Sequence, residues 1–167
     1  MMNYSIRRVL DEDQNEVMNI FNYYIENSYA TFFNKRIPVD FFDKLKDIAY
    51  GNSFYVIEHK EKGVIGFGLL KKYHNSDVFR GVAELGYFIK PEFTNKGLGT
   101  LILDALITDA REMHIKTLLA SISSLNEESL NFHKKHGFFE CGRFKRIGQK
   151  LGKTFDVIWM QKFLEEK

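Results

Sequence analysis

The chain has 167 residues, of which 44% are hydrophobic, and it is rich in phenylalanine and tyrosine. This composition predicts a globular protein with a buried core, and it excludes a disordered or fibrous chain. The formal net charge is only +2, and no stripe of lysine and arginine interrupts the sequence. We therefore expect a small-molecule partner rather than a nucleic acid.

The length is typical of one domain, so we expect a single domain over residues 1–167. Cys141 is the only cysteine and cannot form an internal disulfide, which favours a cytoplasmic protein. No apolar stretch approaches the roughly 18 residues needed to cross a bilayer, and the N-terminus becomes polar at once. We expect neither a membrane partner nor a signal peptide.

The first half of the chain alternates between strand-like and helix-like periodicity. Apolar positions from Val17 to Ile25 recur every three or four residues, which predicts a helix. Pro38 precedes a second helical stretch. The expected elements are strand 4–9, the helix around 17–25, helix 41–49, and strands 53–58 and 64–72, which form a hairpin around Lys62-Gly63.

The run Val82–Ile89 is too short and too aromatic for a helix, so it predicts a buried strand. Gly86 interrupts this run, which is typical of a β-bulge. A glycine-containing loop then leads into a strongly amphipathic helix. Its predicted apolar face consists of Leu98, Leu101, Ile102, Ala105, Leu106, Ala110 and Met113.

The second half predicts strand 117–121 and a helix that Asn126 caps and that ends near Gly137. This order implies a parallel crossover connection. Two aromatic strands, 138–147 and 154–163, complete the chain around a turn that contains Gly148 and Gly152. The predicted fold class is α+β, with a mixed central sheet and flanking helices on both faces.

Residues 94–100 place Gly97 and Gly99 where the loop becomes a helix, at the positive end of the helix dipole. Free backbone N–H groups there bind phosphate, and Lys96 adds a cation. The alternative is that the glycines only permit a tight turn. A dinucleotide fingerprint is excluded, because Leu103 stands where its third glycine belongs.

Two side chains are candidates for moving a proton. Glu84 lies among apolar neighbours, where desolvation would improve it as a base, although it could also be an ordinary salt-bridged strand residue. His133 could transfer a proton near neutral pH, or simply lie on a helix surface. His133 and His136 share a helix face without a third ligand nearby, so we expect no metal. Asn126 is most simply a helix cap.

Three features occur together in order: the strand with Glu84, the turn Lys96-Gly97-Leu98-Gly99, and Asn126-x-x-Ser129 before Phe132-His133-x-x-His136-Gly137-Phe138. Together they resemble the GNAT N-acetyltransferase superfamily. The early segment Tyr24 to Phe32 and the tail Gly148 to Val157 look like the phosphinothricin acetyltransferase branch. The resemblance covers nearly the whole chain.

The resemblance implies direct transfer of an acetyl group from acetyl-CoA to the primary amine of a small molecule, such as an amino acid or its analogue. It implies Glu84 as the base, His133 as the acid, and the N–H of Phe88 or Ile89 as the donor to the oxyanion. Members of the branch are commonly homodimers, and Phe155, Trp159 and Phe163 could supply an exposed apolar face. The expected cofactor-binding residues are Tyr87, Phe88, Ile89, Asn95, Lys96, Gly97, Leu98, Gly99, Thr100 and Asn126.

The sequence departs from the branch at two places. Thr94-Asn95 replaces the usual Arg-Gly pair, and Ser76 replaces an arginine that lies eight residues before the glutamate and suits a substrate carboxylate. Arg80 is a candidate replacement for that arginine. Two alternatives remain open: a protein or peptide N-acetyltransferase, and a catalytically silent acyl-CoA sensor.

Overall fold

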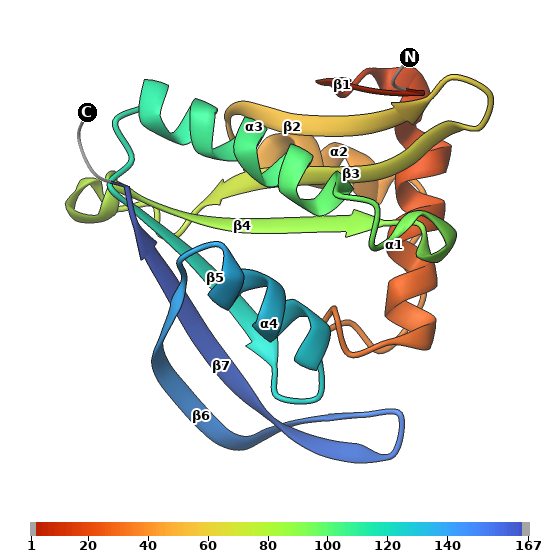
Figure 1. The fold of residues 1–167 in the computed structure, drawn as a ribbon. Coiled ribbons are helices and arrows are strands. Elements are labelled where there is room, and N and C mark those ends of the chain that lie inside the picture. The colour runs from red at the N-terminus through yellow and green to blue at the C-terminus, as the bar shows by residue number, and fades with distance from the viewer. Residues whose placement is uncertain (1–2, 165–167) are drawn as a thin grey trace.

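A computed structural model describes residues 3–164, whose strands form one sheet in the order β1-β2-β3-β4-β5-β7-β6 (Figure 1). In the described part of the chain, β4 and β5 pair in parallel and the other neighbouring strands are antiparallel. The predicted parallel crossover is therefore confirmed. The strands are β1 (Tyr4–Arg8), β2 (Ala49–His59), β3 (Gly63–Lys72), β4 (Val82–Ile89), β5 (Thr117–Ser123), β6 (Phe139–Lys150) and β7 (Lys153–Phe163).

Helices cover both faces of the sheet (Figure 1). Helices α1 (Gln14–Asn27) and α2 (Phe41–Ile48) pack on one face, and α3 (Leu98–Glu112) and α4 (Glu127–Lys135) pack on the other. This arrangement confirms the predicted α+β class with a mixed central sheet. Within residues 3–164, three 3-10 turns complete the elements: η1 (Asp11–Asp13), η2 (Asp77–Phe79) and η3 (Pro91–Phe93).

Each face of the sheet has its own core. Phe21 of α1 contacts Phe67 and Phe88 on one face, with ring centroids 6.0 Å and 5.3 Å away. On the other face, the buried stripe of α3 includes Leu103, which is 0% exposed, whereas the predicted Leu101 is 37% exposed. The helix is confirmed, but its buried face includes Leu103 in place of the predicted Leu101, because the sheet beneath α3 covers the side that carries Leu103.

The gap between β4 and β5 is the feature that positions the site. The two strands pair only from Val82 to Glu84 and separate beyond that point. On its other edge, β4 pairs with β3 without interruption as far as Ile89. The prediction of a β-bulge at Gly86 is therefore wrong, since the β3–β4 ladder has no register shift there. The gap arises because β5 diverges from β4.

The β6–β7 hairpin differs from prediction in its turn and in its exposed face. Leu151 and Gly152 form the turn with φ angles of 48° and 75°, whereas Gly148 lies within β6. Phe155 is only 5% exposed, because Phe32 from the loop after α1 stacks on it with a centroid distance of 6.0 Å. Phe163 is 60% exposed, as predicted.

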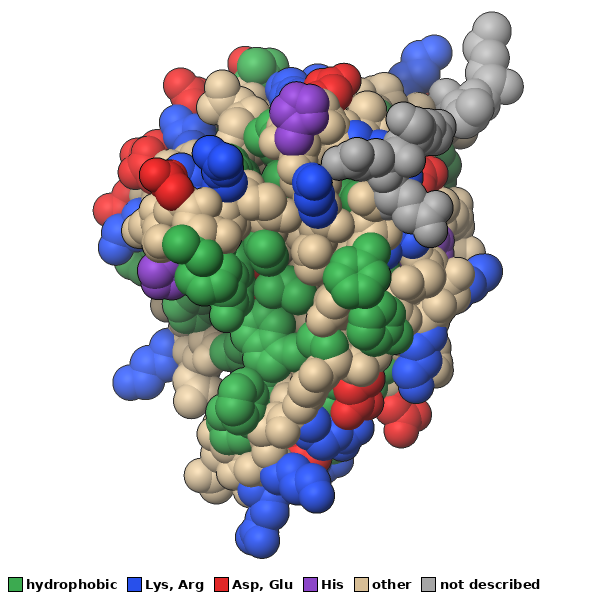
Figure 2. Space-filling model, turned by 90° about the vertical axis from the view of Figure 1, so that its left-hand side faces the viewer, with side chains coloured by type: hydrophobic (Ala, Val, Ile, Leu, Met, Phe, Trp, Pro, Cys, Tyr) green, Lys and Arg blue, Asp and Glu red, His purple; other side chains and the backbone are tan. Residues whose placement is uncertain are grey.

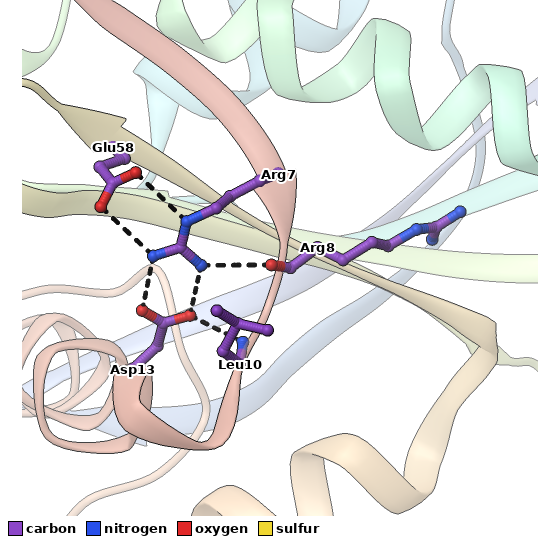
Figure 3. A network of polar contacts seen from close by, with 5 residues as sticks. All are labelled: Arg7, Arg8, Leu10, Asp13 and Glu58. Carbon is purple, nitrogen blue, oxygen red and sulfur yellow. Dashed lines mark hydrogen bonds and ion pairs between the residues drawn. The ribbon is translucent and has the colours of Figure 1, made fainter.

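An arginine cluster fixes the entry into α1 (Figure 3). The Arg7 guanidinium lies between two carboxylates, 2.7 Å from Asp13 and 3.2 Å from Glu58. Burial raises the pKa of Asp13, but hydrogen bonds from Arg7 and from the Leu10 N–H outweigh it and hold that pKa below its ordinary value. This cluster connects β1 and β2 to the start of α1.

Candidate active site

A cavity of about 860 Å³ occupies the gap between β4 and β5. The C-terminal half of β4, the turn before α3, the inner side of α4 and the end of α1 with residues 27–30 line it. Its walls therefore come from segments far apart in sequence. The predicted site segments on β4, on the glycine turn and on α4 all meet here.

The glycine turn forms one end of this cavity. Gly97 caps α3 with a φ of 80°, and a Cβ at this position would meet only open space. The hydrogen-bond ladder of α3 begins with the bond from the Leu101 N–H to the Gly97 carbonyl, so the N–H groups of residues 98–100 precede it. Exposed amides at a helix N-terminus fit the diphosphate of a coenzyme.

The predicted cofactor residues divide into two groups. Lys96 and Leu98 do not line the cavity, because the Lys96 ammonium lies 5.0 Å from the Phe93 ring centroid and the Leu98 side chain is buried. The contribution of Leu98 is thus limited to its backbone N–H. The other predicted residues do line the cavity: Tyr87, Phe88, Ile89, Asn95, Gly97, Gly99, Thr100 and Asn126.

Asn126 keeps its predicted capping role as well. Its side-chain oxygen accepts a hydrogen bond from the Ser129 N–H at 3.2 Å. No group of three or more metal-ligating side chains gathers anywhere within residues 3–164. None of the helices in that range has the length and apolar character required to cross a membrane.

The register of β4 decides which of its backbone amides face the cavity. The Lys90 N–H donates to the Ile65 carbonyl on the β3 side. Because bonding direction alternates along an antiparallel ladder, the N–H of Phe88 also points at β3, whereas those of Tyr87 and Ile89 point into the gap. Of the two predicted oxyanion donors, the structure therefore excludes Phe88 and retains Ile89.

Glu84 is held by two neighbouring strands. Its carboxylate lies 3.1 Å from the Lys71 ammonium of β3 and accepts a 3.0 Å hydrogen bond from the Ser121 hydroxyl of β5. The Glu84 side chain is 13% exposed, and Ser121 lines the cavity. Glu84 is therefore salt-bridged and is not itself a lining residue, but it bonds directly to Ser121, which lines the cavity.

His133 is buried, so the predicted alternative of a surface histidine is wrong. Its Nδ1 lies 2.7 Å from the Ser129 carbonyl, which can only accept, so Nδ1 carries the proton. Nε2 then accepts from the Tyr87 hydroxyl, 2.6 Å away. Burial lowers the pKa of His133 and raises that of Tyr87, so both groups are favoured in their neutral forms.

The two predicted proton carriers lie on opposite faces of β4. Ala83 and Leu85 belong to the core beneath α3, and side chains alternate along a strand. Glu84 therefore points to the α1 face, while Tyr87 and its partner His133 lie on the α3 face. The structure thus places His133 in the cavity wall and Glu84 beside the lining residue Ser121, on the opposite face of the strand.

Several residues of the site were not singled out by sequence reasoning. Ser121 and Lys71 contact Glu84 through strand pairing, which no short-range pattern reveals. Tyr24 donates to the Ile89 carbonyl at 2.5 Å, and Ser28 lines the cavity. Both belong to the segment Tyr24 to Phe32, which resembles the phosphinothricin acetyltransferase branch. That resemblance was the sequence signal that could have identified them as site residues.

The fold and the site together define an acyl-CoA-dependent N-acetyltransferase. The chain belongs to the acetyltransferase (GNAT) family, which matches residues 19–138. The predicted superfamily and enzyme class are confirmed. The chain is 32% identical over 113 residues to the L-amino acid N-acyltransferase MnaT of Escherichia coli, and the match spans 67% of this chain and 66% of that protein.

Two further relatives match almost the whole chain. One is the L-methionine sulfoximine/L-methionine sulfone acetyltransferase of Pseudomonas paraeruginosa, 28% identical over 96% of this chain and 94% of the relative. The other is the phosphinothricin N-acetyltransferase of Alcaligenes faecalis, 24% identical over 95% of this chain and 81% of the relative. The predicted phosphinothricin acetyltransferase-like branch is also confirmed.

Solved structures agree with this assignment. The Salmonella typhimurium protein yncA, solved with its cofactor acetyl-CoA, has a TM-score of 0.88, 25% identity, and coverage of 99% of this chain and 96% of that one. A ribosomal-protein-alanine N-acetyltransferase from Brucella melitensis has a TM-score of 0.86, 28% identity, and coverage of 96% and 99%.

Proposed function

We propose that this protein transfers the acetyl group of acetyl-CoA to the primary amine of a small molecule of the amino-acid class. One observation carries the proposal. The turn before α3 and Ser121, which donates a hydrogen bond to Glu84, line one cavity between β4 and β5. A diphosphate bound at the turn would direct the rest of the coenzyme into this gap. The relatives named for amino-acid acetylation support the acceptor class.

The proposed reaction takes place in a ternary complex. An amine is mostly protonated at neutral pH, and Glu84 removes that proton directly or through one water. The free nitrogen attacks the thioester carbonyl, so an N–C bond forms and the C–S bond breaks. The nitrogen loses its second proton to solvent as the adduct collapses to the amide, and the CoA thiolate that leaves takes a proton from solvent.

The oxyanion formed during attack needs a hydrogen-bond donor. We assign this role to the N–H of Ile89, because the register of β4 directs it into the gap. The carbonyl of the same residue is already held by Tyr24. That contact fixes the strand at the position where the donor must be placed.

His133 is a poor candidate for the acid that the sequence suggested. Both of its ring nitrogens are engaged, and its lowered pKa leaves it neutral at physiological pH. A thiolate with a pKa of about 8.5 gains little from a neutral imidazole. We propose instead that His133 positions Tyr87 against the cavity.

A purified sample with acetyl-CoA and a panel of amines tests the function, with released thiol as the readout. L-Methionine sulfone and phosphinothricin are the first acceptors, and a peptide with a free N-terminal alanine is included. Thiol release that depends on a small acceptor supports the proposal. Acetyl-CoA binding without transfer to any amine would contradict it and favour a silent sensor.

The similarity to a ribosomal-protein-alanine N-acetyltransferase favours a second candidate, a protein N-acetyltransferase. That activity needs an open cleft that accepts a peptide. In the same panel, a kcat/KM for the alanine peptide at least tenfold above that of every free amino acid would select this alternative. The reverse ratio would select the small-molecule acceptor.

We propose a homodimer built through the β6–β7 hairpin. Apolar side chains of these strands are exposed, among them Phe144 at 56%, Ile147 at 57% and Phe163 at 60%. Clustered apolar side chains on a surface are typical of an interface. Light scattering should give twice the chain mass, and Phe144→Lys together with Ile147→Lys should give one chain mass. A wild-type monomer would contradict the proposal.

The remaining expectations also stand as proposals. We place the protein in the cytoplasm, because its lone Cys141 gives no sign of an oxidising compartment. We also propose one domain over residues 1–167, because the length is typical of a single domain. The balanced charge supports the proposal that it has no nucleic-acid partner and no membrane partner. Cell fractionation and a filter-binding assay with duplex DNA test these points.

A further inference from the structure

Lys71 and Glu84 form a pair of opposite charges directly across two strands. They are register partners in the β3–β4 ladder, and their charged groups lie 3.1 Å apart. The Lys71 side chain is 41% exposed, so its ammonium can still reach a ligand. The pair thus presents a carboxylate and an ammonium side by side, next to Ser121, which lines the cavity.

Neither of the residues discussed as the branch's carboxylate-binding arginine supplies a cation at this place. Ser76 caps η2 and accepts from the Val78 N–H at 3.5 Å. Arg80 lines a separate hollow together with Met113 and His114. Within residues 3–164, Lys71 is the basic side chain with an ion pair to Glu84.

Aromatic side chains adjoin the pair on the same face of the sheet. Tyr73 lies two residues beyond Lys71, and Trp159 is the register partner of Ser121, which bonds Glu84. The Tyr73 and Trp159 rings meet edge to face, with centroids 6.4 Å apart. Phe79 adds a third ring, 5.5 Å from Tyr73.

These rings are open to a ligand. Tyr73 is 44% exposed and Phe79 is 38% exposed. Figure 2 shows the side of the molecule that carries the loop between β3 and β4, where hydrophobic side chains gather. A polar pair beside an apolar wall suits a ligand that has two opposite charges at one end and an apolar group at the other.

An α-amino acid has that pattern, since its ammonium and carboxylate flank one carbon atom. We propose that Lys71 binds the carboxylate of the acceptor while Glu84 takes its ammonium, and that Tyr73 and Trp159 contact its side chain. The favoured acceptor is then an α-amino acid with an apolar or aromatic side chain. This inference rests on the proposed function and adds the residues that set its specificity.

Two acceptors that differ only in the carboxylate test the role of Lys71: L-phenylalanine and phenethylamine. Loss of a charge-assisted contact predicts that Lys71→Met lowers kcat/KM for L-phenylalanine about 10- to 100-fold. The value for phenethylamine should fall at least about fivefold less than that for L-phenylalanine, because that amine lacks the carboxylate that Lys71 binds. Lys71→Arg should recover much of the loss. An equal loss for both acceptors would overturn the proposal, because Lys71 would then act on the base.

Lys72→Met is the matched control for this variant. Lys72 is the next residue, and its ammonium lies 5.3 Å from the Tyr50 ring centroid rather than beside Glu84. It should leave the ratio between the two acceptors unchanged. If Lys72→Met shifts that ratio as much as Lys71→Met does, the assignment of Lys71 is wrong.

Trp159→Ala tests the aromatic wall. It should lower kcat/KM for L-phenylalanine at least about fivefold more than for L-alanine, since only the larger side chain reaches the ring. If Trp159→Ala leaves the ratio of kcat/KM for these two amino acids unchanged, Trp159 does not contact the acceptor side chain.

Binding measurements separate this inference from the proposed function. Calorimetry of L-phenylalanine with the wild-type protein and CoA needs no turnover. Binding that Lys71→Met weakens at least tenfold supports the subsite even if no amine is acetylated. If the protein acetylates other amines but does not bind L-phenylalanine, the proposed subsite is wrong and the proposed acetyltransferase function still holds.

Discussion

The Tyr87 hydroxyl donates to Nε2 of His133 across 2.6 Å, which joins β4 to α4 on the α3 face of the sheet. The Ser129 carbonyl holds the other nitrogen of the same imidazole. The histidine is therefore fixed as one neutral tautomer inside the wall of the cavity. This pair makes His133 a structural support for the site and links the stability of the protein to pH.

Because burial lowers the pKa of His133 in the folded protein, the unfolded chain binds a proton more readily. Stability should be fully present above the unfolded histidine value of about 6.5 and should decrease below it by up to about 1.4 kcal/mol per pH unit. Urea unfolding of wild type and His133→Gln at several pH values measures this. The variant should be less stable at pH 7.5 and lose less stability between pH 7 and 5.5.

His114→Asn is the control for that experiment, because His114 is exposed and asparagine tolerates its φ of 57°. It should show the same pH slope as wild type. If His133→Gln and wild type have parallel slopes, His133 does not titrate as a buried neutral group.

Glu84→Gln should reduce turnover of a good acceptor roughly 10- to 1,000-fold, because an amide cannot take the proton of the amine. Acetyl-CoA affinity should be unchanged, since Glu84 lies apart from the glycine turn. Steady-state kinetics from pH 6 to 9, together with calorimetry, measure both. Glu61→Gln, at an exposed turn position, is the matched control. If the Glu84→Gln variant keeps the turnover of the wild type from pH 6 to 9, Glu84 is not the base.

Local patterns were sufficient for the parts of the site that lie close together in sequence. The glycine turn and the cap at Asn126 follow from a few neighbouring residues, and the structure shows both. The contacts of Glu84 with Lys71 and Ser121 depend on how three strands align, which a single sequence does not encode locally. The expected bulge failed for the same reason, because divergence of β5 opens the gap.

Gly97→Ala should weaken acetyl-CoA binding at least about tenfold, because its Cβ would enter the open space where a diphosphate approaches the amides. The φ of 80° adds strain of roughly 1 to 2 kcal/mol for any other residue. Gly63→Ala is the control for strain alone, since Gly63 has a φ of 65° and open space but begins β3, outside the cavity. Equal acetyl-CoA affinity of the two variants would contradict the assignment of Gly97 to the coenzyme site.

Tyr24→Phe tests the contact that fixes the end of β4 beside the proposed oxyanion donor. The variant removes the hydroxyl that donates to the Ile89 carbonyl, and burial raises the pKa of this tyrosine to about 12, so it is a donor throughout the accessible pH range. We expect a loss of about 1 kcal/mol in the free energy of unfolding, from one buried hydrogen bond. We also expect a three- to tenfold lower kcat, because a displaced Ile89 N–H would stabilise the oxyanion less well, on the scale of roughly 1 kcal/mol. Tyr23→Phe removes the same atom from the neighbouring, 45% exposed tyrosine and should change neither quantity. A Tyr24→Phe enzyme that is destabilised but keeps its full kcat would show that the hydroxyl supports the fold without positioning the amide.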